Sequence, residues 1–155
     1  MVRELVLRPL MPADEEAARE LVEAHFSGTR YHARLVEQME TAFRFEDPEY
    51  MAILAVDAEE AMHGLALFGA VAGARQCVKL HAIVSDDAGA IDLLAQGIAE
   101  VCGHSGERLI VCELPDDLPF RPVADALLGG GYAEEGRVAD YVRDGVALRL
   151  LVHRL

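Results

Sequence analysis

The segment KLHAIVSDDAGAIDLLAQGIAEV, residues 79–101, decides how this sequence is interpreted. Its beginning, KLHAIV, has the apolar character of a strand, and from Ala88 apolar residues recur every three or four positions, as on one face of a helix. Two aspartates and one glycine lie near the junction. A helix that starts directly after a strand presents unpaired backbone N–H groups at its first turn, where anions bind favourably. The segment therefore has the form of a phosphate-binding turn.

Asp86 and Asp87 complicate that interpretation. A carboxylate beside a diphosphate costs on the order of 1 kcal/mol or more at a surface-like dielectric. Asp87 also stands where an N-cap residue stands, and a capping carboxylate would occupy the N–H groups that a phosphate needs. The sequence leaves two alternatives open, a working anion site and an ordinary capped connection.

The length and composition indicate one folded domain spanning residues 1–155. Apolar residues make up 52% of the chain and charged residues 26%, and the longest uncharged apolar run is broken by His63 and three glycines, so no membrane span is expected. Residues 1–16 lack the apolar core and cleavage site of a signal peptide, which predicts a cytoplasmic protein. Three cysteines without CxxC spacing are expected to be buried free thiols rather than metal ligands.

The formal charge of −13 reflects 27 acidic residues against 14 basic ones. Such a chain repels nucleic-acid backbones and anionic lipids unless its basic residues are segregated, and no basic cluster is evident in the sequence. We therefore expect neither nucleic acid nor membrane as a partner. The acid excess weakly favours a cationic ligand, such as a polyamine, an aminoglycoside or a protein amine.

Periodicity predicts an α/β layered fold with the element order βααβββαβαββ, a mixed and largely antiparallel seven-stranded sheet, and about four helices. The expected strands cover residues 2–10, 51–57, 62–73, 76–84, 108–114, 132–142 and 146–155. Three expected helices begin near residues 12, 31 and 88, and residues 115–128 are expected to form a turn and then a fourth helix with Pro122 in its first turn. The last two strands, rich in Val, Leu and Tyr, present an edge at which a second copy can pair, which predicts a possible homodimer.

This order resembles the GNAT N-acetyltransferase superfamily over essentially the whole chain. The resemblance is carried by LRPLMPAD (7–14), AEEAMHGLALFG (58–69) and GGGYAEEGRVADYVRDGVAL (129–148), taken in series. It implies acetyl-CoA as donor, an amine as acceptor, and a cleft where the fourth and fifth strands separate. It also implies that the donor's pantetheine arm pairs with the end of the fourth strand, at Ile83 and Val84.

The resemblance further implies that the donor diphosphate binds the turn at Ser85, Ala88, Gly89, Ala90 and Ile91. This turn departs from the family pattern Q/R-x-x-G-x-G/A, because Ser85 replaces the basic or amide residue and Ala88 the first glycine. Arg121 stands where the family has an asparagine. It can contact the diphosphate bidentately and offset the acidic turn, or it can be solvated.

Acyl transfer requires a base for the amine and a proton for the departing thiolate. Strict alternation places Cys77, Lys79, His81 and Ile83 on one face of the fourth strand, which leaves no carboxylate there. His81 is the predicted catalytic base, because an imidazole pKa near 6.5 suits neutral pH; the alternative is a packed histidine. The family's acidic tyrosine position holds Leu127.

Tyr141 is the predicted replacement for the family's tyrosine as the acid that protonates the thiolate, and Tyr132 is a second possibility. Both tyrosines also suit packing within a strand. For the acceptor, the resemblance points to the segment between the first two helices. Phe26, Tyr31 and His32 are expected to bind the amine or else to form a helix-packing corner, and Glu113 is a candidate partner for a cationic substrate or an exposed acid.

The degenerate turn and the missing tyrosine support a second hypothesis of another class. A GNAT-like chain that no longer binds CoA would act as a ligand-sensing or protein-interaction module without catalysis.

Overall fold

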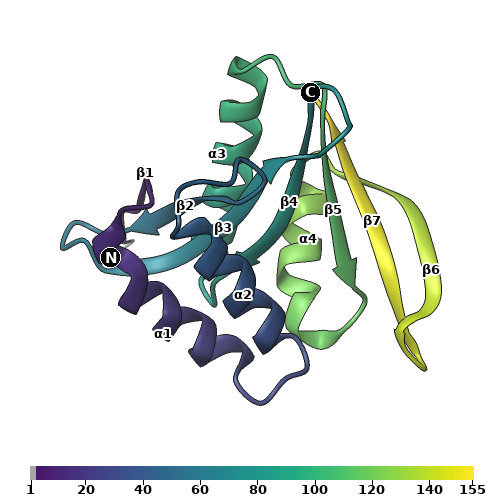
Figure 1. Cartoon of the computed structure of the whole chain (residues 1–155). Coiled ribbons are helices and arrows are strands. Elements are labelled where there is room, and N and C mark those ends of the chain that lie inside the picture. The colour runs from purple at the N-terminus through teal and green to yellow at the C-terminus, as the bar shows by residue number, and fades with distance from the viewer. Residues whose placement is uncertain (1–2) are drawn as a thin grey trace.

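The computed structural model describes residues 3–155 and has the predicted element order (Figure 1). The strands are β1 (Val6–Pro9), β2 (Met51–Val56), β3 (Met62–Ala70), β4 (Cys77–Val84), β5 (Leu109–Pro115), β6 (Ala133–Arg143) and β7 (Val146–Arg154). The helices are α1 (Glu15–Phe26), α2 (His32–Ala42), α3 (Ala88–His104) and α4 (Arg121–Gly129), with short 3₁₀ turns η1 (Pro12–Asp14) and η2 (Leu118–Phe120). Of the strand expected at 2–10, residue 2 lies outside the described residues.

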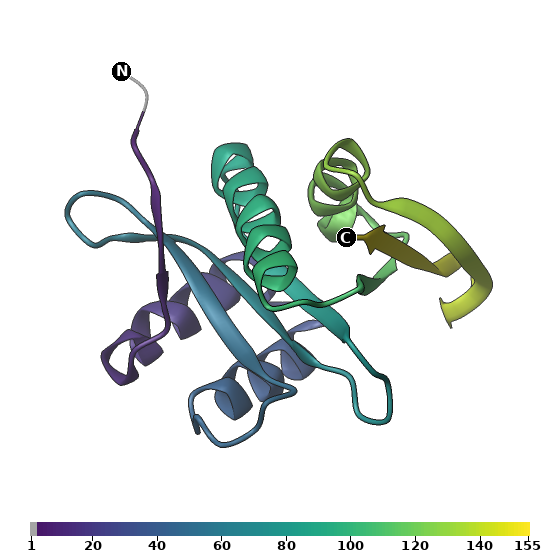
Figure 2. The ribbon, with the colours of Figure 1, turned by 90° about the horizontal axis from the view of Figure 1, so that it is seen from above.

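One seven-stranded sheet forms the middle layer, in the order β1-β2-β3-β4-β5-β7-β6. Within residues 3–155, β4 and β5 form the sole parallel pair, and all other neighbours run antiparallel. The predicted mixed, largely antiparallel sheet is confirmed. Figure 2 shows α1 and α2 on one face of this sheet and α3 and α4 on the other.

The core lies on both faces of the central strands. The apolar stripe predicted for α3 is buried against the sheet at Ile91, Leu94, Ala95, Ile98 and Cys102. Burial of such a stripe supplies most of a helix's stability in water. No helix in the described part of the chain is long and apolar enough to cross a bilayer.

The segment between α2 and β2 crosses the sheet at Gly69 of β3. A Cβ atom at this position would lie 2.1 Å from the Glu49 carbonyl oxygen and 2.6 Å from that of Pro48. The Ala70 amide donates to the Pro48 carbonyl at 3.0 Å, so the two backbones are in direct contact. Glycine is therefore required here for close approach, and the contact fixes the position of Glu49 and Tyr50.

Gly69→Ala is expected to destabilise the protein by about 1–3 kcal/mol, because the atoms it meets belong to backbone that cannot rotate away. The unfolding midpoint should fall by roughly 2–4 °C per kcal/mol in a chain of this length. Gly103→Ala is the control: it lies in α3 with no atom within 4 Å of the added Cβ, so its midpoint should stay unchanged or rise slightly. Equal midpoints for the two variants would contradict the close contact.

Candidate active site

The strands β4 and β5 form a fork. They pair only at Cys77–Leu109, Val78–Ile110 and Lys79–Val111, although β4 continues to Val84 and β5 to Pro115. Beyond the pairs, β4 stays hydrogen-bonded to β3 and β5 stays hydrogen-bonded to β7, so the two strands separate toward their carboxyl ends (Figure 1). The resulting gap is lined by backbone of β4 that has no partner on β5.

A β-bulge lies on β4 just beyond the last pair. Leu67 of β3 pairs with Ala82 and Phe68 pairs with Leu80, so His81 is the extra residue. A bulge bends its strand and increases its twist. The bulge occurs where β4 leaves β5, and it accounts for the divergence of the fork.

The bulge also corrects the expected alternation of side chains. Gly64 of β3 faces α3, since a Cβ there would meet Leu94 and Ala90; Ala66, two residues on, shares that face and pairs with Ile83. Ile83 therefore faces α3, whereas Lys79 and His81 line a cavity beside α2. The predicted common face for these residues is wrong for Ile83, because one extra residue reverses the alternation that follows it.

His81 is held by two contacts from the segment that Gly69 positions. Its Nε2 lies 2.7 Å from the Glu49 carbonyl oxygen, and its ring stacks on Tyr50 with centroids 4.5 Å apart and planes at 14°. A carbonyl only accepts, so Nε2 carries the hydrogen and Nδ1 of the neutral ring keeps a lone pair. Burial lowers the pKa of His81 below its usual 6.5, and the charges of Lys79 and Arg34 lower it further.

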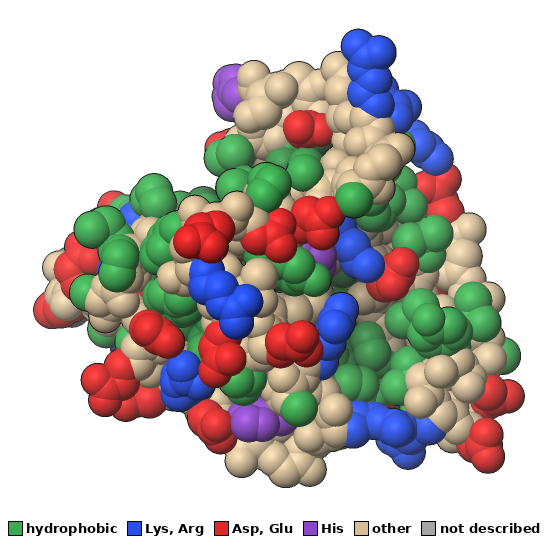
Figure 3. All heavy atoms as spheres, in the orientation of Figure 1, with side chains coloured by type: hydrophobic (Ala, Val, Ile, Leu, Met, Phe, Trp, Pro, Cys, Tyr) green, Lys and Arg blue, Asp and Glu red, His purple; other side chains and the backbone are tan. Residues whose placement is uncertain are grey.

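The cavity beside His81 has a volume of about 220 Å³ and lies between α2, the fork and the chain after β5. Its polar lining consists of Arg30, Tyr31, Arg34, Gln38, Lys79, His81 and Glu113. Lys79 and Glu113 stand on opposite arms of the fork and form an ion pair at 3.5 Å. Figure 3 shows this face of the molecule, with basic side chains between α2 and β5.

The predicted acceptor residues have different positions. Tyr31 lines the cavity with its ring edge against Phe120, at 4.7 Å between centroids, and its hydroxyl donates to Asp117 at 2.7 Å. Burial and the Asp117 carboxylate raise the pKa of Tyr31 to about 12. Phe26 is buried against Phe120, and His32 lies 2.8 Å from Glu23; neither borders the cavity.

The sequence reasoning missed two arginines and a glutamine that line this cavity. Arg30, Arg34 and Gln38 recur every four residues, with Arg30 in the turn before α2 and the other two on the helix. The spacing of four places Arg34 and Gln38 on one face of α2 and was a usable signal.

At the start of α3, Asp87 takes the capping role. Its Oδ1 accepts hydrogen bonds from the amides of Gly89 at 2.8 Å and Ala90 at 3.2 Å. Ser85 fixes the turn from the other side, since its hydroxyl donates to the His63 carbonyl at 2.6 Å and accepts from the Asp87 amide. In this arrangement the helix start does not fit a diphosphate, because a carboxylate already occupies two of its donors.

The remaining predicted donor contacts vary in accessibility. Ile83, Val84, Ala90 and Ile91 have buried side chains, whereas Ala88, Gly89 and Arg121, at the start of α4, are exposed. The unpaired β4 edge suits a linear arm that forms strand-like hydrogen bonds. Tyr141 is 66% exposed on β6 and is not part of the lining of the cavity beside His81.

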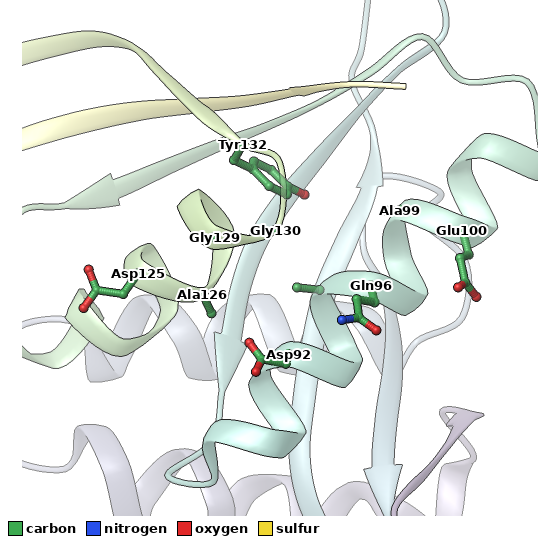
Figure 4. A pocket seen from close by; sticks show the side chains of 10 residues that line it. Asp92, Gln96, Ala99, Glu100, Asp125, Ala126, Gly129, Gly130 and Tyr132 are labelled. Atoms are coloured by element: carbon green, nitrogen blue, oxygen red, sulfur yellow. The ribbon is translucent and has the colours of Figure 1, made fainter.

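A groove of about 550 Å³ separates α3 from α4 (Figure 4). Asp92, Glu100 and Asp125 make it acidic, and Tyr132 forms part of its wall. The Tyr132 hydroxyl is buried without a hydrogen-bond partner in residues 3–155, and burial raises its pKa. Three carboxylates make this groove unfavourable for an anion.

Solved structures share this architecture from end to end. A GNAT-family protein from Desulfovibrio desulfuricans is 18% identical with a TM-score of 0.82, covering 97% of this chain and 99% of its own. A GCN5-related N-acetyltransferase from Kribbella flavida is 19% identical with a TM-score of 0.73, covering 97% and 98%. The yncA structure from Salmonella typhimurium, which contains acetyl-CoA, is 14% identical with a TM-score of 0.73, covering 97% and 94%.

No family model matches the chain, and no curated protein matches it by sequence. The structural similarities show that the chain has the fold of the GNAT N-acetyltransferases.

Asp87→Ala should have two effects of opposite sign. Loss of the cap should destabilise the protein by about 1 kcal/mol. Release of two amides and removal of one charge should strengthen acetyl-CoA binding if the donor diphosphate binds here. Isothermal titration measures the affinity and thermal unfolding the stability.

Asp86→Ala is the matched control, since it removes the neighbouring charge and leaves the cap in place. If Asp86→Ala and Asp87→Ala strengthen acetyl-CoA binding equally, the gain comes from the lost charge alone. That result would contradict binding of the diphosphate by the released amides.

Proposed function

We propose that the chain is an N-acyltransferase that moves an acetyl group from acetyl-CoA to the primary amine of a small acceptor. The observation that carries this proposal is the fork, with His81 on its bulged arm beside a cavity. The unpaired edge of β4 would hold the linear arm of the donor, and the cavity on the α2 side would hold the acceptor. The shared fold supports this division but does not define the acceptor.

In the proposed reaction, Nδ1 of His81 takes a proton from the acceptor ammonium. The amine nitrogen then attacks the thioester carbonyl carbon and a C–N bond forms. The nitrogen of this tetrahedral adduct loses its second proton to solvent as the C–S bond breaks. The thiolate leaves with a proton from solvent or from a tyrosine, for which Tyr141 stays a prediction. The lowered pKa of His81 keeps the imidazole neutral at pH 7, so the base is ready before the substrate arrives.

Thermal unfolding with acetyl-CoA tests the donor. Ligand at about 100 times its Kd adds roughly 2.7 kcal/mol, which should raise the midpoint by about 5–10 °C. If acetyl-CoA, CoA and longer acyl-CoA forms all leave the midpoint unchanged, the acyltransferase proposal fails. That result would favour the second candidate, a non-catalytic binding module, for which the Asp87 cap is the supporting observation.

His81→Gln should lower kcat/KM by about 10²–10⁴-fold, because the amide can still donate to the Glu49 carbonyl but cannot take a proton. In the unsubstituted protein, kcat/KM should rise with pH to a plateau with a midpoint below 6.5, since burial holds the pKa of His81 down. The variant should lose this ascending limb.

His104→Gln, exposed at the end of α3, is the control and should keep both the rate and the limb. A variant at position 81 with an unchanged pH profile would show that His81 is a packing residue.

A further inference from the structure

The lining of the cavity beside His81 carries a charge opposite to that of the chain. Arg30, Arg34 and Lys79 border the cavity, against Glu113 as its one carboxylate among the described residues. The chain as a whole has a formal charge of −13. The net positive lining therefore does not follow from composition, and it favours a different acceptor from the cationic one that the net charge suggested.

The two arginines are free to bind a ligand. Arg34 lies 3.9 Å from Glu37, but both side chains are about two-thirds exposed or more, so this pair contributes little. Arg30 forms no ion pair with any residue in 3–155. Lys79 is already paired with Glu113 across the fork. The uncompensated positive charge thus belongs to the turn before α2 and to the first turn of that helix.

A side-chain amide in the cavity wall adds a second, uncharged polar group beside the arginines. Gln38 is 9% exposed, lines the same cavity, and makes no side-chain hydrogen bond within the described chain. Its amide is not among the buried unpaired polar atoms of residues 3–155, so it is open to the cavity and can donate to a ligand without losing a hydrogen bond within the protein. Gln38 follows Arg34 by one helical turn, and the two therefore serve one site.

The position and size of the cavity restrict the anion. It lies on the α2 face of the sheet, whereas the turn at Asp87 leads into α3 on the opposite face (Figure 2). The arginines are thus separated from that turn by the sheet. A volume of about 220 Å³ is below the roughly 300–1,000 Å³ of pockets for drug-sized ligands, so the occupant is small.

We propose that the acceptor is a small amine that also carries a carboxylate, as a free amino acid does. The carboxylate binds the guanidinium groups of Arg34 and Arg30 and the Gln38 amide, while the amine lies toward His81 and Glu113. A planar guanidinium binds a carboxylate with paired hydrogen bonds, which a lysine cannot reproduce. This inference rests on the proposed function for its reaction, but the binding preference can be measured without turnover.

The first experiment measures binding alone. Thermal unfolding is recorded with each of the common L-amino acids and with the corresponding amino acid amides, which keep the amine and lose the negative charge. At least one acid should raise the midpoint while its amide does not. The amine of an amino acid amide is less basic than the amine of the free acid, so a larger share of it is unprotonated and reactive at neutral pH. A preference for the acid therefore has to come from the carboxylate.

The second experiment places the preference on α2. Arg34→Gln should weaken binding of the selected acid by about ten- to a hundredfold, which is the effect of losing a charge-assisted hydrogen bond. The affinity for the corresponding amide should change by less than about twofold. Arg30→Gln should do the same to a smaller extent. Arg44→Gln is the matched control, because it is an exposed arginine outside the cavity and should change neither. An unchanged unfolding midpoint without ligand verifies that each variant folds.

The outcomes separate this inference from the proposed function. If the protein binds amino acids in preference to their amides and Arg34→Gln removes this preference, the inference is supported. This holds even if acetyl-CoA does not bind and the acyltransferase proposal fails. Amines without a carboxylate that are acetylated or bound as well as the acids overturn the inference and leave the acyltransferase standing. No shift with any acid also overturns it.

Discussion

The pairing between β4 and β5 ends after three residues, and the rest of the candidate site depends on that limit. A fully paired sheet would have no gap between these strands and no unpaired edge for a ligand. The gap is tolerated because each strand keeps its other neighbour, β3 or β7. The Lys79–Glu113 ion pair spans the two arms where they separate. The bulge at His81 turns β4 at this point and directs the imidazole into the cavity.

The fold could be predicted well from the sequence because its signals are periodic and local. The stripe on α3 from Ile91 to Cys102 predicts a helix on a sheet, and the structure buries those residues. The side-chain faces of β4 could not be predicted in the same way. Strict alternation assumes a regular strand, and a single inserted residue, whose position depends on pairing with β3, moves Ile83 to the other face.

The candidate site shows the same division between local and tertiary information. Asp87 as a cap is a local property and was one of the two alternatives that the sequence left open. The contacts of His81 with Glu49 and Tyr50 come from residues more than thirty positions away and depend on the close approach at Gly69. Tyr31 was identified from its segment, but Phe26, five residues earlier, is directed into the core by the turn that joins the helices.

The net charge of a chain is a poor guide to the charge of a pocket. Charge summed over a surface governs solubility and long-range encounter, whereas a ligand in a cavity interacts with the few groups within several ångströms. Here the acids lie largely on exposed surfaces, while α2 directs Arg34 and Gln38 toward the fork. A negative molecule with a positive pocket would repel anions at a distance and bind them at short range. Affinity for a small zwitterion avoids that conflict, because such a ligand carries no net charge during its approach and presents its carboxylate to the arginines only once it is bound.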